Sequence, residues 1–102
     1  MSDSGTATPT QQVDNERVRV TEWRFRPGDA TGWHVHEYDY VIVPSLDGTL
    51  RTVDDEGEQL AELKAGVSYY REAGVKHDVI NAGDGEMAFI EVEIKAHGLS
   101  NR

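Results

Sequence analysis

Turn-forming residues recur along this chain roughly every 8 to 12 residues, and this rhythm limits the folds open to it. The stretches between the turns are short and rich in β-branched and aromatic side chains, as in Arg17 to Phe25. Pro27-Gly28-Asp29 ends that stretch, and Trp33 to Val43 forms a second extended run that holds one strand or two. Short strands with frequent turns are typical of a sandwich or barrel. The sequence therefore predicts an all-β domain.

Three further segments refine this prediction. Asp47-Gly48 is a strong hairpin signal, flanked by Val41–Val43 and Leu50–Val53. A second turn is expected at Asp54–Gly57. The segment Glu58–Ala65 contains good helix formers and is compatible with a single helical turn. The recurring turns elsewhere favour a strand there.

The clearest strand lies near the end of the chain. Its aliphatic residues alternate with a second, mostly charged set: Ala88, Ile90, Val92 and Ile94 against Phe89, Glu91, Glu93 and Lys95. A period of two places each set on its own face of a strand. We expect the aliphatic row to face the core, and Glu91 and Glu93 to lie on the solvated face.

The length and the ends of the chain suggest one domain with two tails. The 102 residues suit a single domain, which we place at 14–96. Residues 1–13 are mostly small and polar, which predicts a disordered tail, and residues 97–102 are expected to form a loose tail that includes His97. A domain this small buries only about two thirds of its unfolded surface. We therefore expect a homodimer.

Composition argues against several classes of protein. The absence of cysteine excludes disulfides, thiolate metal sites and a cysteine nucleophile. With 19 acidic and 10 basic side chains the formal charge is −9, which argues against nucleic acid or anionic lipid as partners. No apolar run has the length of a membrane span, and the N-terminus lacks the apolar stretch of a signal peptide. We expect a soluble, cytoplasmic protein.

Three of the four histidines suggest a metal site. His34 and His36 are two apart on an expected strand, so both imidazoles point to the same face. His77 begins another β-like run after a glycine-containing turn, and a barrel can bring it beside the first pair. Neutral imidazole is the commonest metal ligand in proteins, and three leave other positions open for substrate or water. The alternative is a metal-free barrel with these histidines hydrogen-bonded inside it.

The spacing around these histidines resembles the two motifs of the cupin superfamily. The first motif is matched by Gly28, His34-Val35-His36 and Gly48, and the second by Gly66, Gly74, His77 and Asn81. Together they span residues 28 to 81, half of the chain. The resemblance implies a double-stranded β-helix of antiparallel strands with a small-molecule site inside. The stretch from Gly32 to Leu50 is most similar to small bacterial cupins, some associated with β-alanine degradation.

Two positions depart from the cupin motifs. Glu72 replaces the proline of the second motif, which alters a turn. The acidic metal ligand of the first motif is missing, and either Tyr40 or Val41 falls in its place. Strict alternation puts Tyr40 on the face of the two histidines, so we prefer Tyr40. Its roles remain open between a fourth ligand, a hydrogen-bond donor to substrate and a barrel aromatic, and we name it as the catalytic candidate.

The resemblance implies a three-histidine site like that of cupin thiol dioxygenases. It implies a divalent metal, Fe(II), Zn, Ni or Mn, and a metal-dependent enzyme acting on a small polar or carboxylate substrate. Dioxygenation with Fe(II) ranks first, and isomerase or lyase chemistry with Zn, Mn or Ni follows. The alternative function is a non-enzymatic cupin that binds or senses a small metabolite or metal.

Other side chains are candidates for binding a substrate. Tyr38 is expected on the same face as Tyr40. Tyr69 and Arg71 are two apart, and an inward-facing Arg71 is suited to bind a carboxylate with two hydrogen bonds. A surface arginine in a salt bridge is the alternative for Arg71. Trp23 and Phe25 are expected either to pack inside the barrel or to form a dimer surface.

Overall fold

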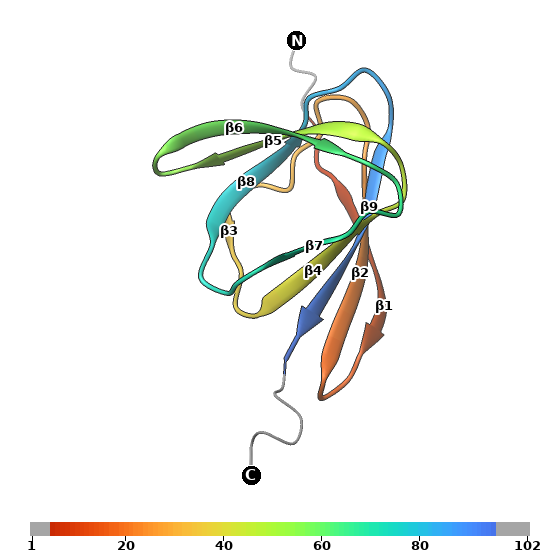
Figure 1. The fold of residues 1–102 in the computed structure, drawn as a ribbon, viewed down its shortest axis with the longest axis vertical. Helices are drawn as coiled ribbons and strands as arrows, with labels where there is room; N and C mark the ends of the chain where they lie inside the picture. Colours follow the sequence, from red (N-terminus) through yellow and green to blue (C-terminus); the bar gives the residue numbers. More distant parts are fainter. Residues whose placement is uncertain (1–4, 96–102) are drawn as a thin grey trace.

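Two antiparallel β-sheets face each other in the computed structural model, which describes residues 5–95 (Figure 1). Those residues contain no helix, and therefore none long and apolar enough to cross a membrane. The strands of this part of the chain are β1 (Thr8–Asp14), β2 (Val18–Phe25), β3 (His34–Val35), β4 (Asp39–Pro44), β5 (Gly48–Asp54), β6 (Gly57–Leu63), β7 (Tyr69–Arg71), β8 (Lys76–Asn81) and β9 (Met87–Ile94). The prediction of an all-β double-stranded β-helix is confirmed.

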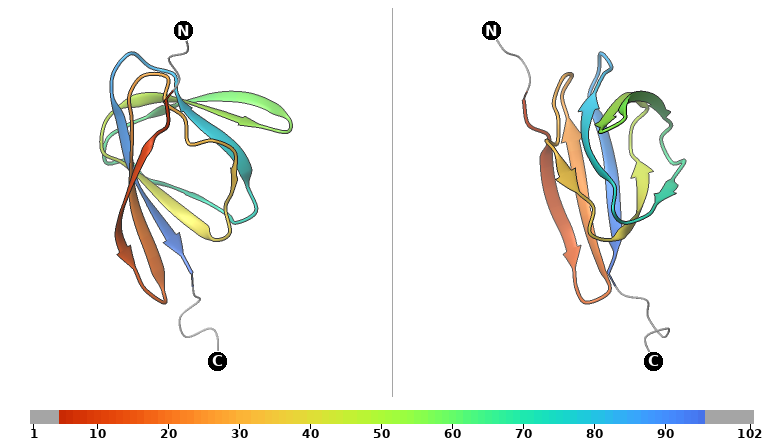
Figure 2. Two further views of the ribbon diagram at one scale, coloured as in Figure 1. Left: turned by 180° about the vertical axis from the view of Figure 1, so that it is seen from behind. Right: turned by 90° about the vertical axis from the view of Figure 1, so that its left-hand side faces the viewer.

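Most neighbours in each sheet come from distant parts of the sequence, apart from the consecutive pairs β1–β2 and β5–β6. One sheet has the order β1-β2-β9-β4-β7 and the other has the order β3-β8-β5-β6. Every strand pairing is antiparallel. Figure 2 shows the two layers from other directions, with β2 and β9 running side by side. The apolar core lies between the layers and includes Phe25, Ile42, Leu50, Met87 and Phe89.

The predicted hairpin at Asp47-Gly48 is wrong. Strand β4 pairs with β7 and β9, whereas β5 pairs with β6 and β8, so this connection passes from one sheet to the other. Tertiary contacts hold the crossing in place. The Asp47 carboxylate accepts a 2.8 Å hydrogen bond from the Ala65 amide, and a Cβ at Gly48 would lie 3.1 Å from Met87 Cγ. Turn chemistry alone does not reveal that the two flanking strands belong to different sheets.

The other two predictions for this region are confirmed. Residues Asp54 and Gly57 are paired at the end of the β5–β6 hairpin. Gly57 has a φ of 129°, a conformation that side chains other than glycine rarely adopt. The segment Glu58–Ala65 is largely strand, because β6 runs from Gly57 to Leu63. The predicted strand over Arg17 to Phe25 corresponds to β2, and the run from Trp33 to Val43 divides into β3 and β4.

The sequence predicted a disordered tail at residues 1–13, and this prediction is wrong for the residues from Thr8 onward. Residues Thr8–Asp14 form β1, which pairs with β2 from Thr8 opposite Arg24 to Asp14 opposite Arg19. All seven residues of β1 are exposed, so the backbone hydrogen bonds of the ladder, and not apolar burial, define this strand. Residues 1–4 and the expected tail at 97–102, with His97, lie outside the described residues.

Strand β9 presents the face opposite to the one expected. Phe89, Glu91 and Glu93 are buried between the sheets, whereas Ile94 is 38% exposed. The outward aliphatic row is flanked by aliphatic neighbours, because Val92 lies between Val20 of β2 and Val41 of β4. The inward carboxylates have polar partners across the ladder, as described below. The placement of Glu91 and Glu93 on a solvated face is therefore wrong.

Candidate metal centre

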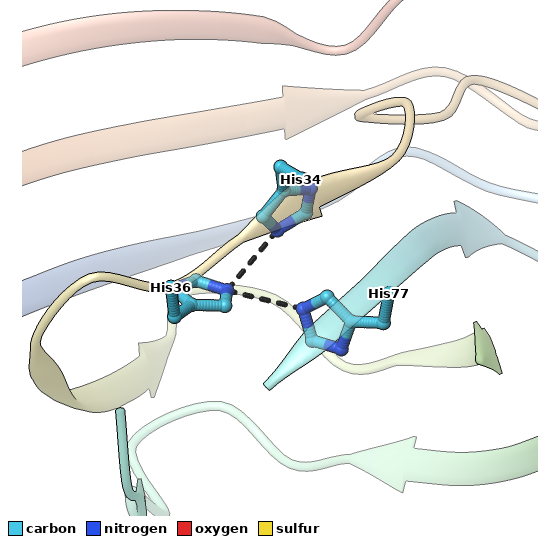
Figure 3. A group of neighbouring side chains, drawn as sticks. All are labelled: His34, His36 and His77. Carbon is cyan, nitrogen blue, oxygen red and sulfur yellow. Dashed lines mark hydrogen bonds between the residues drawn. The ribbon is translucent and has the colours of Figure 1, made fainter. Parts of the chain in front are cut away.

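Three imidazoles meet at one point between the sheets (Figure 3). Strand β3 pairs with β8 so that His34 stands directly opposite His77. His36 follows β3, and its backbone is fixed by two 2.8 Å hydrogen bonds: its amide donates to the Val75 carbonyl, and its carbonyl accepts from the Gly74 amide. The sequence prediction that these histidines converge is confirmed.

The distances between the ring nitrogens suit a metal ion. His36 Nε2 lies 3.1 Å from His34 Nε2 and 3.1 Å from His77 Nε2. Two imidazole nitrogens bound to one zinc-sized ion lie about 2.9 Å apart at a right angle and about 3.3 Å apart at the tetrahedral angle. The two observed separations fall between these values, and the three ligand nitrogens lie within 4.8 Å of one another, so the cluster is suited to hold one metal ion.

A hydrogen bond sets the protonation of His34. Its Nδ1 lies 2.8 Å from the carbonyl oxygen of Gly32, which only accepts hydrogen bonds. Nδ1 therefore carries the proton, and the lone pair is on Nε2, toward the other histidines. Gly32 has a φ of 89°, and this conformation helps to turn the loop back toward His34.

The other two histidines are neutral at physiological pH. Burial, together with the neighbouring imidazoles of His34 and His77, lowers the pKa of His36 to about 3. Burial and the nearby His34 also lower the pKa of His77 to about 4. A histidine binds a metal through a neutral imidazole, so the protein holds both rings in the form that a ligand requires.

Tyr40, preferred at the position of the missing carboxylate, lies on β4 of the opposite sheet and contacts His36. Its ring stacks on His36 with centroids 3.9 Å apart and an interplanar angle of 18°. The side chain is buried, and burial raises the pKa of Tyr40 far above its usual range. The phenol is therefore neutral, and it packs against the flat face of His36.

A cavity of about 610 Å³ opens beside the histidines, a volume suited to a small ligand. Tyr69 and the exposed Arg71 both line it. The ladder explains this, since β7 pairs Arg71 with Tyr40 and Tyr69 with Ile42. The Arg71 guanidinium carbon lies 4.6 Å from the centre of the Tyr69 ring, a cation–π contact that holds the positive charge at the cavity wall.

Tyr38 does not line the cavity. It lies in the loop between β3 and β4, where strict alternation does not hold, and the Arg19 guanidinium carbon is 5.7 Å from the centre of its ring. Arg19 in turn bonds Glu93, which lines the cavity, and the expectation that Tyr38 shares the face of Tyr40 stays a prediction. Trp23, by contrast, lines the cavity, and Phe25 is fully buried. Of the two alternatives for these aromatic residues, packing inside the barrel is therefore the one observed.

Sequence reasoning missed two carboxylates on β9. Glu93 receives two hydrogen bonds from the Arg19 guanidinium, at 2.6 and 3.1 Å. Glu91 Oε1 accepts a 3.3 Å hydrogen bond from the Trp23 indole nitrogen, and its Oε2 lies 3.8 Å from His36 Nδ1. Burial, with the neighbouring charge of Glu93, raises the pKa of Glu91 to about 7. Arg19 and Trp23 are four residues apart on β2 and share one face, and this spacing was the available signal of a polar inner face.

Comparisons with known proteins agree with this architecture. Residues 21–93 match the cupin domain family. The chain is 56% identical over 95 residues to the β-alanine degradation protein BauB of Pseudomonas aeruginosa, covering 93% of this chain and 100% of that protein. The crystal structure of a cupin domain from Bordetella pertussis is 53% identical, with a TM-score of 0.90 over 94% of this chain and 100% of the other.

A more distant structure supports the fold alone. An RmlC-like cupin family protein from Methanocaldococcus jannaschii, described as a double-stranded β-helix, superposes with a TM-score of 0.73 at 17% identity. The match covers 92% of this chain and 84% of that protein.

Proposed function

This chain belongs to the cupin domain family, and from that premise we propose that it binds one divalent metal ion on His34, His36 and His77. The convergence of the three ring nitrogens carries the proposal. Imidazole ligands suit Fe(II), Zn, Ni and Mn alike, so availability in the cell contributes to the choice among them.

We further propose that the protein is an enzyme acting on a small polar or carboxylate-bearing molecule. When bound, the metal supplies Lewis acidity or, as Fe(II), activation of oxygen. Three neutral imidazoles leave its full positive charge in place, which favours an anionic substrate. BauB is named for β-alanine degradation, and this supports a small carboxylate as the substrate class. Dioxygenation ranks first, with isomerase or lyase chemistry after it.

Different side chains contact different parts of the substrate. Arg71 receives the carboxylate through paired hydrogen bonds, and the Tyr69 ring fixes the guanidinium. The neutral Tyr40 phenol donates a hydrogen bond to a substrate beside His36. Ile42, Leu50 and Phe89 form an apolar part of the cavity wall.

The second candidate function is a non-enzymatic cupin that binds or senses a small metabolite or metal. One observation favours it: burial holds Tyr40 as a neutral phenol, so it is not a base near neutral pH. A binding protein needs only the cavity, the cationic Arg71 and the histidine cluster.

We propose that the protein forms a homodimer in the cytoplasm and has no nucleic-acid partner. The outer face of the β2–β9–β4 sheet supports the dimer, because Val20, Val92 and Val41 lie side by side there and Ile94 is 38% exposed. The formal charge of −9 argues against nucleic acid.

Oxygen uptake and substrate turnover distinguish the two functions. Untagged protein is loaded anaerobically with Fe(II) and offered small amino acids and thiol carboxylates. Separate samples loaded with Zn, Ni or Mn are followed for isomerised or cleaved products. Turnover that disappears in His77→Ala supports the enzyme. If the protein binds metal and carboxylate but turns over none of them under any loading, the proposal of an enzyme fails and the binding function takes its place.

A further inference from the structure

A carboxylate and an indole lie at the Nδ1 edge of His36, away from the other two histidines. Glu91 is only 9% exposed, although it lies in the cavity wall. Its Oε1 accepts the hydrogen bond from the Trp23 indole nitrogen at 3.3 Å, and its Oε2 lies 3.8 Å from His36 Nδ1. The three side chains form a line from β2 through β9 to the metal centre.

The contacts at the other edge of His36 determine its tautomer in the metal-free protein. His36 Nε2 lies 3.1 Å from His34 Nε2. Because the His34 proton is on Nδ1, His34 Nε2 carries a lone pair and can only accept a hydrogen bond. Two facing lone pairs at that distance repel each other. The His36 proton therefore sits on Nε2, where it donates to His34 or to His77, the other nitrogen at 3.1 Å.

A metal ion bound by the same three nitrogens needs the lone pair of His36 Nε2. The Nε2–H bond must then break and an Nδ1–H bond must form, so that the ring remains neutral with one proton. The moved proton requires an acceptor at the Nδ1 edge. A carboxylate that receives the free N–H of a metal-binding histidine fixes the ring's orientation and raises its basicity.

We propose that Glu91, anchored by the Trp23 indole, is a positioning residue that accepts the Nδ1 proton of His36 and selects the tautomer that binds metal. The inference rests on the proposed metal site and deepens it. The 3.8 Å distance between Glu91 Oε2 and His36 Nδ1 is longer than a hydrogen bond. The hydrogen bond forms when the Glu91 carboxylate moves roughly 1 Å closer to His36. The adjoining cavity leaves room for that movement.

The first test measures Zn(II) affinity by competition with a chelator, using untagged wild type, Glu91→Gln, Trp23→Phe and Glu86→Gln. Glu91→Gln removes the charge and leaves one acceptor oxygen for two donors, the Trp23 indole N–H and the His36 Nδ1–H. Weakening the acceptor of a ligating histidine lowers metal affinity about 10- to 100-fold, which we expect for this variant. Trp23→Phe removes only the anchor and should weaken binding less. Glu86 immediately precedes β9, and its side chain is 51% exposed, so Glu86→Gln should leave the affinity unchanged.

The second test follows the His36 ring nitrogens by ¹⁵N NMR. In the metal-free wild type we expect the proton on Nε2. With Zn(II) bound it should be on Nδ1, with a shift that changes in Glu91→Gln while His34 stays constant. A purely structural role for Glu91 would not change this signal selectively.

The outcomes separate the two proposals. Wild type that binds no Zn(II) overturns the metal site and this inference with it. Wild type that binds, with Glu91→Gln equal to it in affinity and His36 shift, overturns only the inference. An Nδ1–H tautomer in the metal-free wild type also overturns it. If Glu91→Gln does not fold, Trp23→Phe and the wild-type tautomer still decide the question.

Discussion

Replacing Glu93 by glutamine tests whether β9 turns its carboxylates inward. The Arg19 guanidinium donates to both carboxylate oxygens of Glu93, at 2.6 and 3.1 Å, and the two side chains are 33% and 9% exposed. Glutamine keeps the shape but removes the charge and one of the two acceptors. Arg19, which is partly buried, then loses the carboxylate that it bonds directly.

The magnitude follows from this burial. Removing one partner of a fully buried ion pair costs about 3–5 kcal/mol. Arg19 is one third exposed, so water solvates part of its charge, and we expect a loss of about 2 kcal/mol. For a domain of this size that corresponds to a fall in Tm of roughly 8 to 16 °C.

Urea unfolding of metal-free protein at pH 7, followed by circular dichroism, measures this loss. The matched control is Glu86→Gln, because Glu86 pairs with Arg24 at 3.1 Å in an exposed position. The control should unfold with the wild type. If the two variants are equally stable, Glu93 is not buried against Arg19, and the inward orientation of β9 is refuted.

Three further predictions follow from the core, the titrating groups and the cavity. Phe25 is fully buried, and its ring centre is 5.5 Å from that of Phe89. Phe25→Ala should therefore lower the free energy of unfolding, measured in urea, by about 3–5 kcal/mol. A loss below about 1 kcal/mol would contradict this packing. Because the folded-state pKa values of His36 and His77 are lowered to about 3 and about 4, their contribution to stability is present above pH 6.5 and is lost as pH falls toward 4. The pKa of Glu91 is raised to about 7, so this group binds a proton more readily in the folded state and opposes that loss of stability between pH 6.5 and 4.5. Metal-free Glu91→Gln should therefore lose stability on acidification more steeply than wild type, by up to about 1.4 kcal/mol per pH unit. Equal slopes of stability against pH would contradict this expectation. Arg71→Ala should weaken binding of a small carboxylate to the metal-loaded protein by roughly 10- to 100-fold in calorimetry, whereas Arg51→Ala, a residue that does not line the cavity, should not; an unchanged affinity in Arg71→Ala would remove Arg71 from the proposed site.

The sequence predicted the fold class and the histidine cluster because both depend on spacing. The two-residue interval of His34 and His36 fixes a shared face on any strand. The recurring turns indicate short antiparallel strands before their order is known. The position of His77 relative to the first pair followed from the motif resemblance.

The errors arise where a local pattern leaves a choice that only tertiary contacts make. Alternation along β9 gives a period of two but not which set faces inward, and Glu93 lies inside because Arg19 is opposite it. The Asp47-Gly48 signal describes a turn but not the sheet to which each flanking strand belongs. Strand β1 has no buried side chain, so its pairing with β2 leaves no mark in hydropathy.

A metal ion at His34, His36 and His77 underlies the proposed function, and metal content measured by mass spectrometry on untagged protein tests it most directly. The comparison is a His34→Ala/His77→Ala variant purified in parallel. We expect close to one equivalent of a divalent metal in the wild type and its loss in the variant. Absence of metal from both, even after reloading with Fe(II), Zn(II), Ni(II) and Mn(II), would contradict it.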